Sequence, residues 1–305
     1  PVESVVPSIA DCIEALSEPG AKVIVQPPVY DPFYAVVRAT GRECMENSLI
    51  HDEHGYHMNF EELEQMCQNG ASVLLLCSPH NPVGRVWNEK ELNRVAEICN
   101  RYHVTVISDE IHWDLILGRQ KHITMGKYAE LLNSLVICTS CSKSFNLAGL
   151  QTSNLIIPDE TARRKVQNFL YGRYRFNPNT FGMIATETAY TKGDEWLAEE
   201  IDYIRENAEF VEYFLKGNLP KVTMSKLQGT YLVWLDMRAC HRSSEQLVRM
   251  FAREGAALND GSHYGKGYDG FVRMNIACPR SQLEEGLFCI YRALEKAEEM
   301  DEQQK

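Results

Sequence analysis

Long apolar runs are missing from this 305-residue sequence. The stretches that come closest, at residues 72–77 and 104–107, are strand-sized, whereas a membrane-spanning helix needs about 20 apolar residues. An excess of basic residues is also missing, because 31 lysines and arginines face 42 aspartates and glutamates and the net charge is −11. Such a surface as a whole repels a nucleic-acid backbone. The sequence therefore predicts neither a membrane nor a nucleic acid as partner.

A second pair of closely spaced cysteines is missing as well. The sequence has ten cysteines, and Cys138 and Cys141 form a lone CxxC among otherwise irregular spacings. A common zinc site needs a second pair, so we expect no metal site and interpret the cysteines as reduced thiols. The histidine-rich run at 51–57 has no defined ligand geometry, and its polar composition favours a turn. With no signal peptide visible, we expect a cytoplasmic protein.

The start of the sequence lacks an initiator methionine. The chain begins at Pro1, directly before an apolar stretch, Val5-Val6-Pro7, that we expect to open a helix. A natural domain rarely starts so abruptly. We therefore expect an N-terminal segment to be missing from the sequence.

Strands and helices alternate over the first two-thirds of the chain. The clearest helix is expected at 88–101, where Asn88 can cap the first turn and apolar residues recur on one face. Other helices are expected at 32–40, ended by Gly41, and at 60–68; strands are expected at 22–26, 72–77, 104–108, 134–139 and 152–157. Continuous apolar strands that follow helices predict an α/β fold with a largely parallel sheet covered on both faces.

The pattern changes near residue 194. We expect one long helix at 195–216 that ends at Gly217, and then strands at 230–236 and 271–276 with helices at 244–253 and from 281 onward. This order predicts an α+β arrangement. We therefore expect a large domain at 1–193 and a small C-terminal domain at 194–305, which includes the linking helix.

Polar and aromatic residues follow four of the expected strands. In an open α/β sheet, ligands bind beyond the carboxyl ends of the strands. The residues found there are Tyr30, Asn81, Asp109, and Lys143 with its neighbours Ser140 and Ser142. These residues are therefore the first candidates for a functional site.

This set has a chemical logic. The Lys143 amine can form an imine with an aldehyde cofactor, and Asp109 can pair with a protonated pyridine nitrogen. Asn81 can donate to a phenolic oxygen, and Tyr30 can stack on a ring. A phosphate would suit the hydroxyls of Ser140 and Ser142, together with free N–H groups of the helix that opens near Pro7.

Four segments carry a resemblance to a known family. They are SPHNPVGRV (78–86), SDEIHWDL (108–115), SCSKSFNLAGLQ (140–151) and VRMNIACPR (272–280). In this order they resemble pyridoxal 5′-phosphate (PLP) enzymes of fold type I, in the class I/II aminotransferase superfamily. Within it the chain most resembles the MalY/PatB group of carbon–sulfur lyases, known as cystathionine β-lyases. The likeness runs through essentially the whole chain.

The resemblance implies a role for each matching residue. Lys143 matches the lysine that binds the cofactor as a Schiff base, and Arg273 matches the clamp for the substrate's α-carboxylate, a group that suits a guanidinium fork. Cofactor-binding roles are implied for Asp109 at the pyridine nitrogen, Asn81 at the phenolic oxygen, Tyr30 on the ring face, His112, and Ser140, Ser142, Val5 and Val6 around the phosphate. Asn81 and Tyr30 are expected to contact the substrate as well.

Two positions distinguish a lyase from an aminotransferase in this comparison. Ordinary class I aminotransferases usually have an arginine where this chain has Gln151, and often a tyrosine where it has His112. Both residues match the lyase group, so we expect α,β-elimination of cystathionine- or cysteine-type amino acids to pyruvate, ammonia and a thiol. A class I/II aminotransferase is the first alternative. The second is a non-catalytic, aminotransferase-like sensor module of a transcription regulator.

The resemblance also has implications for assembly. Fold-type-I active sites generally lie at the interface of a dimer, so a homodimer is expected. Family members also have an N-terminal segment before the phosphate loop, which reaches into the partner subunit's pocket. The site residues named above are therefore expected to be an incomplete set.

Overall fold

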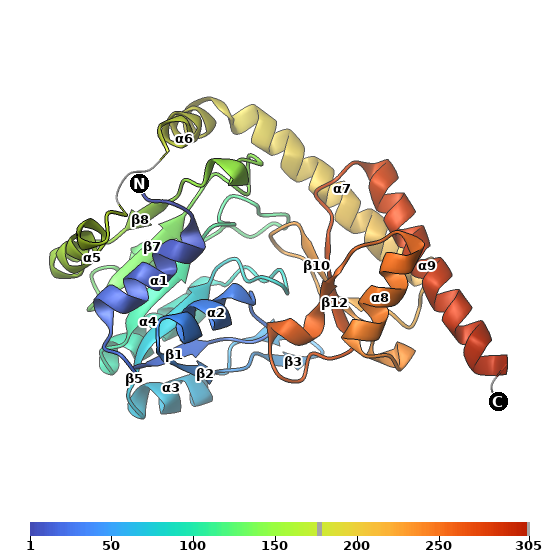
Figure 1. Cartoon of the computed structure of the whole chain (residues 1–305), viewed down its shortest axis with the longest axis horizontal. Coiled ribbons are helices and arrows are strands. Elements are labelled where there is room, and N and C mark those ends of the chain that lie inside the picture. Colours follow the sequence, from blue (N-terminus) through green and yellow to red (C-terminus); the bar gives the residue numbers. More distant parts are fainter. Residues whose placement is uncertain (176–178, 304–305) are drawn as a thin grey trace.

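A six-stranded sheet lies at the centre of the larger part of the molecule (Figure 1). The computed structural model describes residues 1–175 and 179–303. The strand order is β2-β1-β5-β6-β7-β8. The strands are β1 (Lys22–Val25), β2 (Glu43–Glu46), β5 (Ala71–Cys77), β6 (Thr105–Asp109), β7 (Leu135–Thr139) and β8 (Asn154–Ile156). Neighbouring strands run parallel except β7 and β8, which are antiparallel. The expected α/β class with a largely parallel sheet is confirmed.

Helices cover both faces of this sheet. One face packs against α1 (Val5–Leu16), α2 (Pro32–Ala39) and α5 (Glu160–Gly172), and the other against α3 (Phe60–Gln68) and α4 (Glu89–Arg101). Alternate residues of a strand face opposite cores, as Val73 and Leu74 of β5 do. Burial on both faces explains why the strands read as continuous apolar runs.

The ends of the helices follow the sequence signals. Asn88 caps α4, because its side chain accepts a hydrogen bond from Glu91 N while the Glu91 carboxylate accepts one from Asn88 N. Helix α1 begins at Val5, so Pro7 lies in its first turn, where a backbone N–H would have no partner within the helix. Both helix starts therefore lie where the sequence predicted them.

The C-terminal part contains a four-stranded antiparallel sheet of order β11-β12-β10-β9. Its elements are α7 (Asp194–Asn218), β9 (Thr223–Met224), β10 (Leu232–Asp236), α8 (Ser244–Glu254), β11 (Asn259–Asp260), β12 (Phe271–Asn275) and α9 (Arg280–Gln303). Helix α7 runs from the large sheet to this smaller one (Figure 1). An α+β arrangement after residue 194 was expected, whereas the domain boundary at 193/194 stays a prediction.

The two sheets share a hydrophobic core. Trp234, Tyr264 and Phe271 of the C-terminal part are buried in the same cluster as Trp87 and the residues of α3 and α4. A hairpin of β3 (Ile50–Asp52) and β4 (Gly55–His57) reaches this cluster, and Trp234 Nε1 donates a hydrogen bond to Tyr56 Oη at 3.2 Å. This hairpin is the polar run that was interpreted as a turn.

Three expectations differ from the structure. Gly217 lies inside α7, which continues to Asn218, because a glycine in a helix costs only about 1 kcal/mol and does not have to end it. The strand expected at 152–157 is limited to β8, at 154–156. Helices α5 and α6 (Thr180–Lys192) were not predicted. In α6 the apolar residues are not confined to one face, so the sequence gives no helical period.

Three kinds of feature are missing from the described residues. None of their helices is both apolar enough and long enough to cross a bilayer. Residues 1–175 and 179–303 also contain no cluster of three or more histidine, cysteine or acidic side chains suited to a metal ion. The ten cysteines within these ranges are free thiols.

Candidate active site

One cavity of about 290 Å³ lies at the carboxyl ends of β5, β6 and β7, beside the smaller sheet. It is near the lower limit of typical small-ligand pockets, which is about 300 Å³. All the site residues expected from the sequence line it: Lys143, Asp109, Asn81, Tyr30, His112, Ser140, Ser142, Val5, Val6 and Arg273, with Gln151. The structure thus brings together residues that lie up to 268 positions apart in the sequence, from Val5 to Arg273.

Asp109 lines the cavity from the end of β6. It is the last residue of β6 and is buried, and its Oδ1 accepts a hydrogen bond from Ile111 N at 3.1 Å. Burial raises the pKa of Asp109 from 3.8 to about 7, although that hydrogen bond and the charge of Lys143 oppose the rise. Within the described residues no cation lies close enough to Asp109 for an ion pair. The carboxylate would therefore be stabilised by a cationic ligand.

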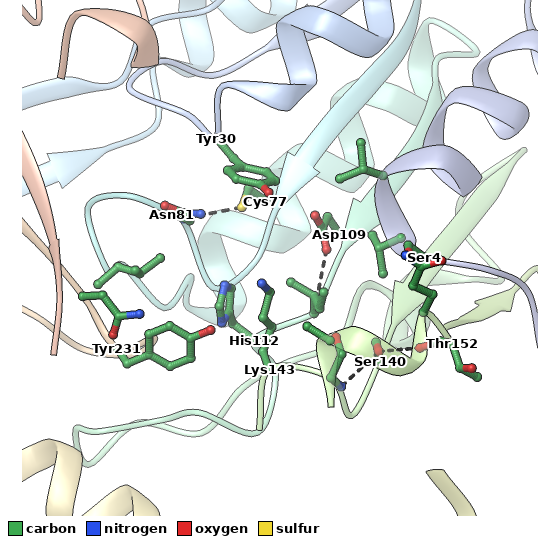
Figure 2. A pocket seen from close by; sticks show the side chains of 18 of the residues that line it. Ser4, Tyr30, Cys77, Asn81, Asp109, His112, Ser140, Lys143, Thr152 and Tyr231 are labelled. Carbon is green, nitrogen blue, oxygen red and sulfur yellow. Dashed lines mark hydrogen bonds between the residues drawn. The ribbon is translucent and has the colours of Figure 1, made fainter. Parts of the chain in front are cut away.

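Lys143 faces the same space from the turn after β7. Burial, and then the positive charge of Arg273, lower the pKa of the Lys143 amine, while Asp109 acts in the opposite direction. Figure 2 shows the Lys143 side chain pointing into the cavity near His112. The neutral amine is the form of lysine that attacks an aldehyde or removes a proton, and a lowered pKa makes this form more abundant near neutral pH.

His112 is buried next to Lys143. Burial, followed by the charges of Lys143 and Arg273, lowers the pKa of His112 to about 3, so the ring is neutral. Its Nδ1 is buried without a hydrogen-bond partner in the described residues, and its ring meets Tyr231 edge-on with centroids 5.6 Å apart. A neutral imidazole with an unused nitrogen can bind a polar atom of a ligand.

One end of the cavity suits a phosphate. The first turn of α1 lies there, and Val5 and Val6 occupy positions whose N–H groups have no partner within the helix. Ser140 Oγ accepts from Ser142 N at 3.1 Å and donates its proton to Thr152 O at 2.7 Å. Ser140 therefore has no proton left for a phosphate, and the geometry favours the Ser142 hydroxyl as the donor.

Arg273 enters the cavity from the middle of β12. Its Nη1 donates to Asn81 Oδ1 at 3.1 Å, and its Nη2 donates to Asn259 Oδ1 at 2.9 Å. The guanidinium also lies over the Tyr264 ring, 5.2 Å from the centroid. Because Asn81 uses its oxygen for Arg273, its amide N–H groups are left to donate to a ligand. Asn259 and Tyr264 both contact Arg273, and the sequence indicated neither of them.

Further residues line the cavity that sequence reasoning missed. They are Ser4, Cys77, Ile111, Ala148, Thr152, Tyr231, Leu232 and Asn275. Cys77 pairs with Asp109 in the parallel register of β5 and β6, so the strand-end rule could have found it. Leu232 and Asn275 come from the antiparallel sheet and Tyr231 directly precedes it, and that rule does not apply there. Figure 2 shows the Tyr231 hydroxyl on the side of His112 and Lys143.

This donor set fits PLP. Lys143 and Asp109 influence each other's pKa without forming an ion pair, which leaves room between them for a ring. In PLP the aldehyde and the pyridine nitrogen lie on opposite sides of the ring. Tyr30 contributes an aromatic face, and the α1 end can receive the phosphate.

Comparisons with known proteins identify the family and its relatives. The family model for aminotransferase class I and II matches residues 6–289. Cystathionine beta-lyase PatB of Bacillus subtilis is 40% identical over 293 residues, which cover 95% of this chain and 76% of that protein.

Solved structures of similar proteins share the fold of this chain and contain PLP. Cystalysin of Treponema denticola, which contains pyridoxal 5′-phosphate, is 31% identical with a TM-score of 0.92, and the match covers 97% of this chain and 76% of that one. A PLP-bound protein of Clostridium difficile 630 is 38% identical with a TM-score of 0.92, and the match covers 95% of this chain and 76% of that one.

Proposed function

Because this chain belongs to the aminotransferase class I and II family, whose relatives bind pyridoxal 5′-phosphate, we propose that it is a carbon–sulfur β-lyase. The proposed substrates are cysteine- or cystathionine-type amino acids, which would be cleaved to pyruvate, ammonia and a thiol. The observation that carries the proposal is a single cavity in which Lys143, Asp109 and Arg273 meet. The likeness to PatB favours the lyase reaction over amine transfer.

The cofactor would supply an aldehyde for Lys143 and a ring that accepts the electron pair from the substrate's Cα–H bond. Arg273 would bind the α-carboxylate through the guanidinium edge that Asn81 and Asn259 hold in place. The Lys143 amine, whose pKa is lowered by burial and by the charge of Arg273, would remove the Cα proton in its neutral form. Asp109 would hold a proton at the pyridine nitrogen.

The remaining cavity residues would surround the cofactor and the substrate. The Tyr30 ring would stack on the cofactor, and Asn81 and the neutral His112 would bind its polar atoms. The phosphate would meet Ser142, Val5 and Val6. Tyr231, whose hydroxyl lies on the side of Lys143 and His112, would contact the substituent on Cβ. Departure of a thiolate from Cβ completes the elimination.

Product analysis tests the reaction. The protein loaded with PLP is expected to release pyruvate and free thiol from cystathionine or cysteine without an added keto acid. Alanine is the matched control, because it has no leaving group on Cβ. Keto-acid-dependent amine transfer without thiol release would identify an aminotransferase instead. Cofactor binding without either reaction would point to the sensor module.

A second copy of the chain is the proposed partner. Large apolar side chains are exposed around α6 and the edge strand β8, including Tyr174 (85% exposed), Phe181 (76%) and Ile184 (56%). Exposed apolar side chains gathered in this way are typical of an interface. Light scattering of the purified protein is expected to give twice the mass of one chain, and a monomer at micromolar concentration would contradict the proposal.

A further inference from the structure

The turn that carries Lys143 is anchored by the next residue along the chain. Ser144 is fully buried, and its Oγ donates a hydrogen bond to Asp114 Oδ1. Asp114 lies beyond the end of β6, five positions after Asp109. This hydrogen bond therefore connects the segment that follows Asp109 with the segment that carries Lys143. Asp109 and Lys143 line the cavity, whereas Ser144 and Asp114 lie outside it.

Helices α6 and α7 contact the same turn through Phe145, the residue after Ser144. Phe145 stacks on Trp196 with ring centroids 5.4 Å apart and meets Tyr190 edge-on at 6.2 Å. Gly193, between the two helices, lies so close that a Cβ there would be 2.4 Å from the Phe145 ring. These contacts fix the backbone on one side of Lys143, while the polar contact of Ser144 fixes a side chain directly next to it.

Apart from Ser144, Asp114 interacts with its own backbone N–H and with the charge of His122, and burial raises its pKa. Its Oδ2 is buried without a hydrogen-bond partner in the described residues, so Ser144 is its principal side-chain partner. Glu200 on α7 also has a buried, unpaired oxygen, and burial together with the negative charge of Asp114 raises the pKa of Glu200 to about 7. A buried acid that makes one side-chain hydrogen bond costs stability, so its presence calls for a functional reason.

We propose that Asp114 is a positioning residue for Lys143, and that it acts through the hydroxyl of Ser144. Lys143 must place one nitrogen both at the cofactor aldehyde and at the substrate's Cα proton. A displacement of about 1 Å at such a centre can lower a rate roughly 100-fold. The proposal rests on the role of Lys143 in the proposed function, but it does not depend on whether elimination or amine transfer follows.

A double-mutant cycle tests the link between the two residues. The variants are Ser144→Ala, Asp114→Ala and the pair together, with Asp114→Asn to keep an acceptor oxygen but remove the charge. Asp202→Ala is the matched control, because it removes an aspartate of α7 whose side chain is 67% exposed and pairs with Arg205 at the surface. Far-ultraviolet circular dichroism and the unfolding midpoint of each variant show whether it is folded.

Two readouts separate positioning from a general loss of structure. The first is the rate at which the imine absorbance appears when PLP is mixed with cofactor-free protein, which requires no turnover. The second is the division of the kinetic effect between kcat and KM. Ser144→Ala and Asp114→Ala are each expected to slow imine formation and lower kcat by about 10-fold or more, with KM nearly unchanged. Asp114→Asn is expected to remain closer to the wild type.

The double variant decides the proposal. If Asp114 acts through Ser144, the pair is expected to be no slower than Ser144→Ala alone. Effects that multiply would overturn the proposal, as would normal imine formation in a folded Ser144→Ala protein. Failure of the lyase assay in the wild type would overturn the proposed function. The double-mutant cycle on imine formation would still test the role of Asp114, because it requires no turnover.

Discussion

Replacing Lys143 with alanine is expected to remove both the imine absorbance of the PLP-loaded protein and the release of thiol. The amine is the nucleophile for the aldehyde and the base for the Cα proton, so no other group performs either task in the described cavity. Activity is expected to fall by at least about 1000-fold. Absorbance titration with PLP and a thiol assay, performed on the same preparation, measure the two losses.

Lys127→Ala is the control for this experiment. Lys127 lies in a short helical turn, its side chain is 49% exposed, and it pairs with Glu89 away from the cavity. That variant should bind PLP and turn over as the wild type does. An imine band of normal intensity in Lys143→Ala would mean that another lysine carries the cofactor, and the assignment of Lys143 would then be wrong.

Replacing Asp109 with asparagine is expected to have opposite effects on catalysis and on stability. An amide cannot hold the ring nitrogen in its protonated form, so kcat should fall roughly 100- to 1000-fold, as it does when other preorganised electrostatic groups are removed. In the cofactor-free protein the same change removes a buried carboxylate that no described cation pairs with. The cofactor-free variant should therefore unfold at a higher temperature than the wild type.

The pH dependence of this stability effect has a defined sign. The pKa of Asp109 is about 7 in the folded protein, above its ordinary value of 3.8. Between about pH 4 and pH 7 the carboxyl group of Asp109 therefore holds a proton in the folded state that it has lost in the unfolded state. Its contribution to the free energy of unfolding is fully present below about pH 4 and is lost as the pH rises through about 7. The advantage of Asp109→Asn should be largest near pH 8 and small near pH 4.

Thermal unfolding of the two cofactor-free proteins across this pH range makes the comparison, with Asp202→Asn as a surface control. A stability difference that grows as the pH falls would contradict the assigned ionisation. Loading with PLP should reverse the order at about pH 8, because a cationic ring nitrogen gives the wild-type carboxylate a partner that the asparagine cannot use.

Much of the fold could be predicted because its signals are local. Strands such as β5 are apolar without interruption, since both faces of the sheet are covered, and α4 carries a complete capping box at Asn88. Helix α6 was missed because its exposed Phe181 and Ile184 break any one-sided pattern. In the proposed dimer a second copy would cover these side chains, and a local pattern does not contain such information.

The site could be predicted where it follows strand ends and family motifs. Asp109 and Cys77 end neighbouring parallel strands, and Lys143 lies in the turn after the next one. Asn259 and Tyr231 were missed because the strand-end rule does not apply to antiparallel strands: Asn259 reaches Arg273 from the start of β11, and Tyr231 lines the cavity from the residue before β10. The partner of Ser144 was missed for another reason: Asp114 belongs to a motif already identified, but its contact runs outside the cavity.

The shared core has a consequence for the thermodynamics of the whole chain. Trp234, Tyr264 and Phe271 fill the same interior as Trp87, and the β3–β4 hairpin bonds to Trp234. Cutting the chain near residue 193 would leave an aromatic-sized void beside Trp87 and an exposed apolar face on each fragment. The two sheets should therefore melt together, as one calorimetric transition, and both sides of the cavity should be lost at the same temperature.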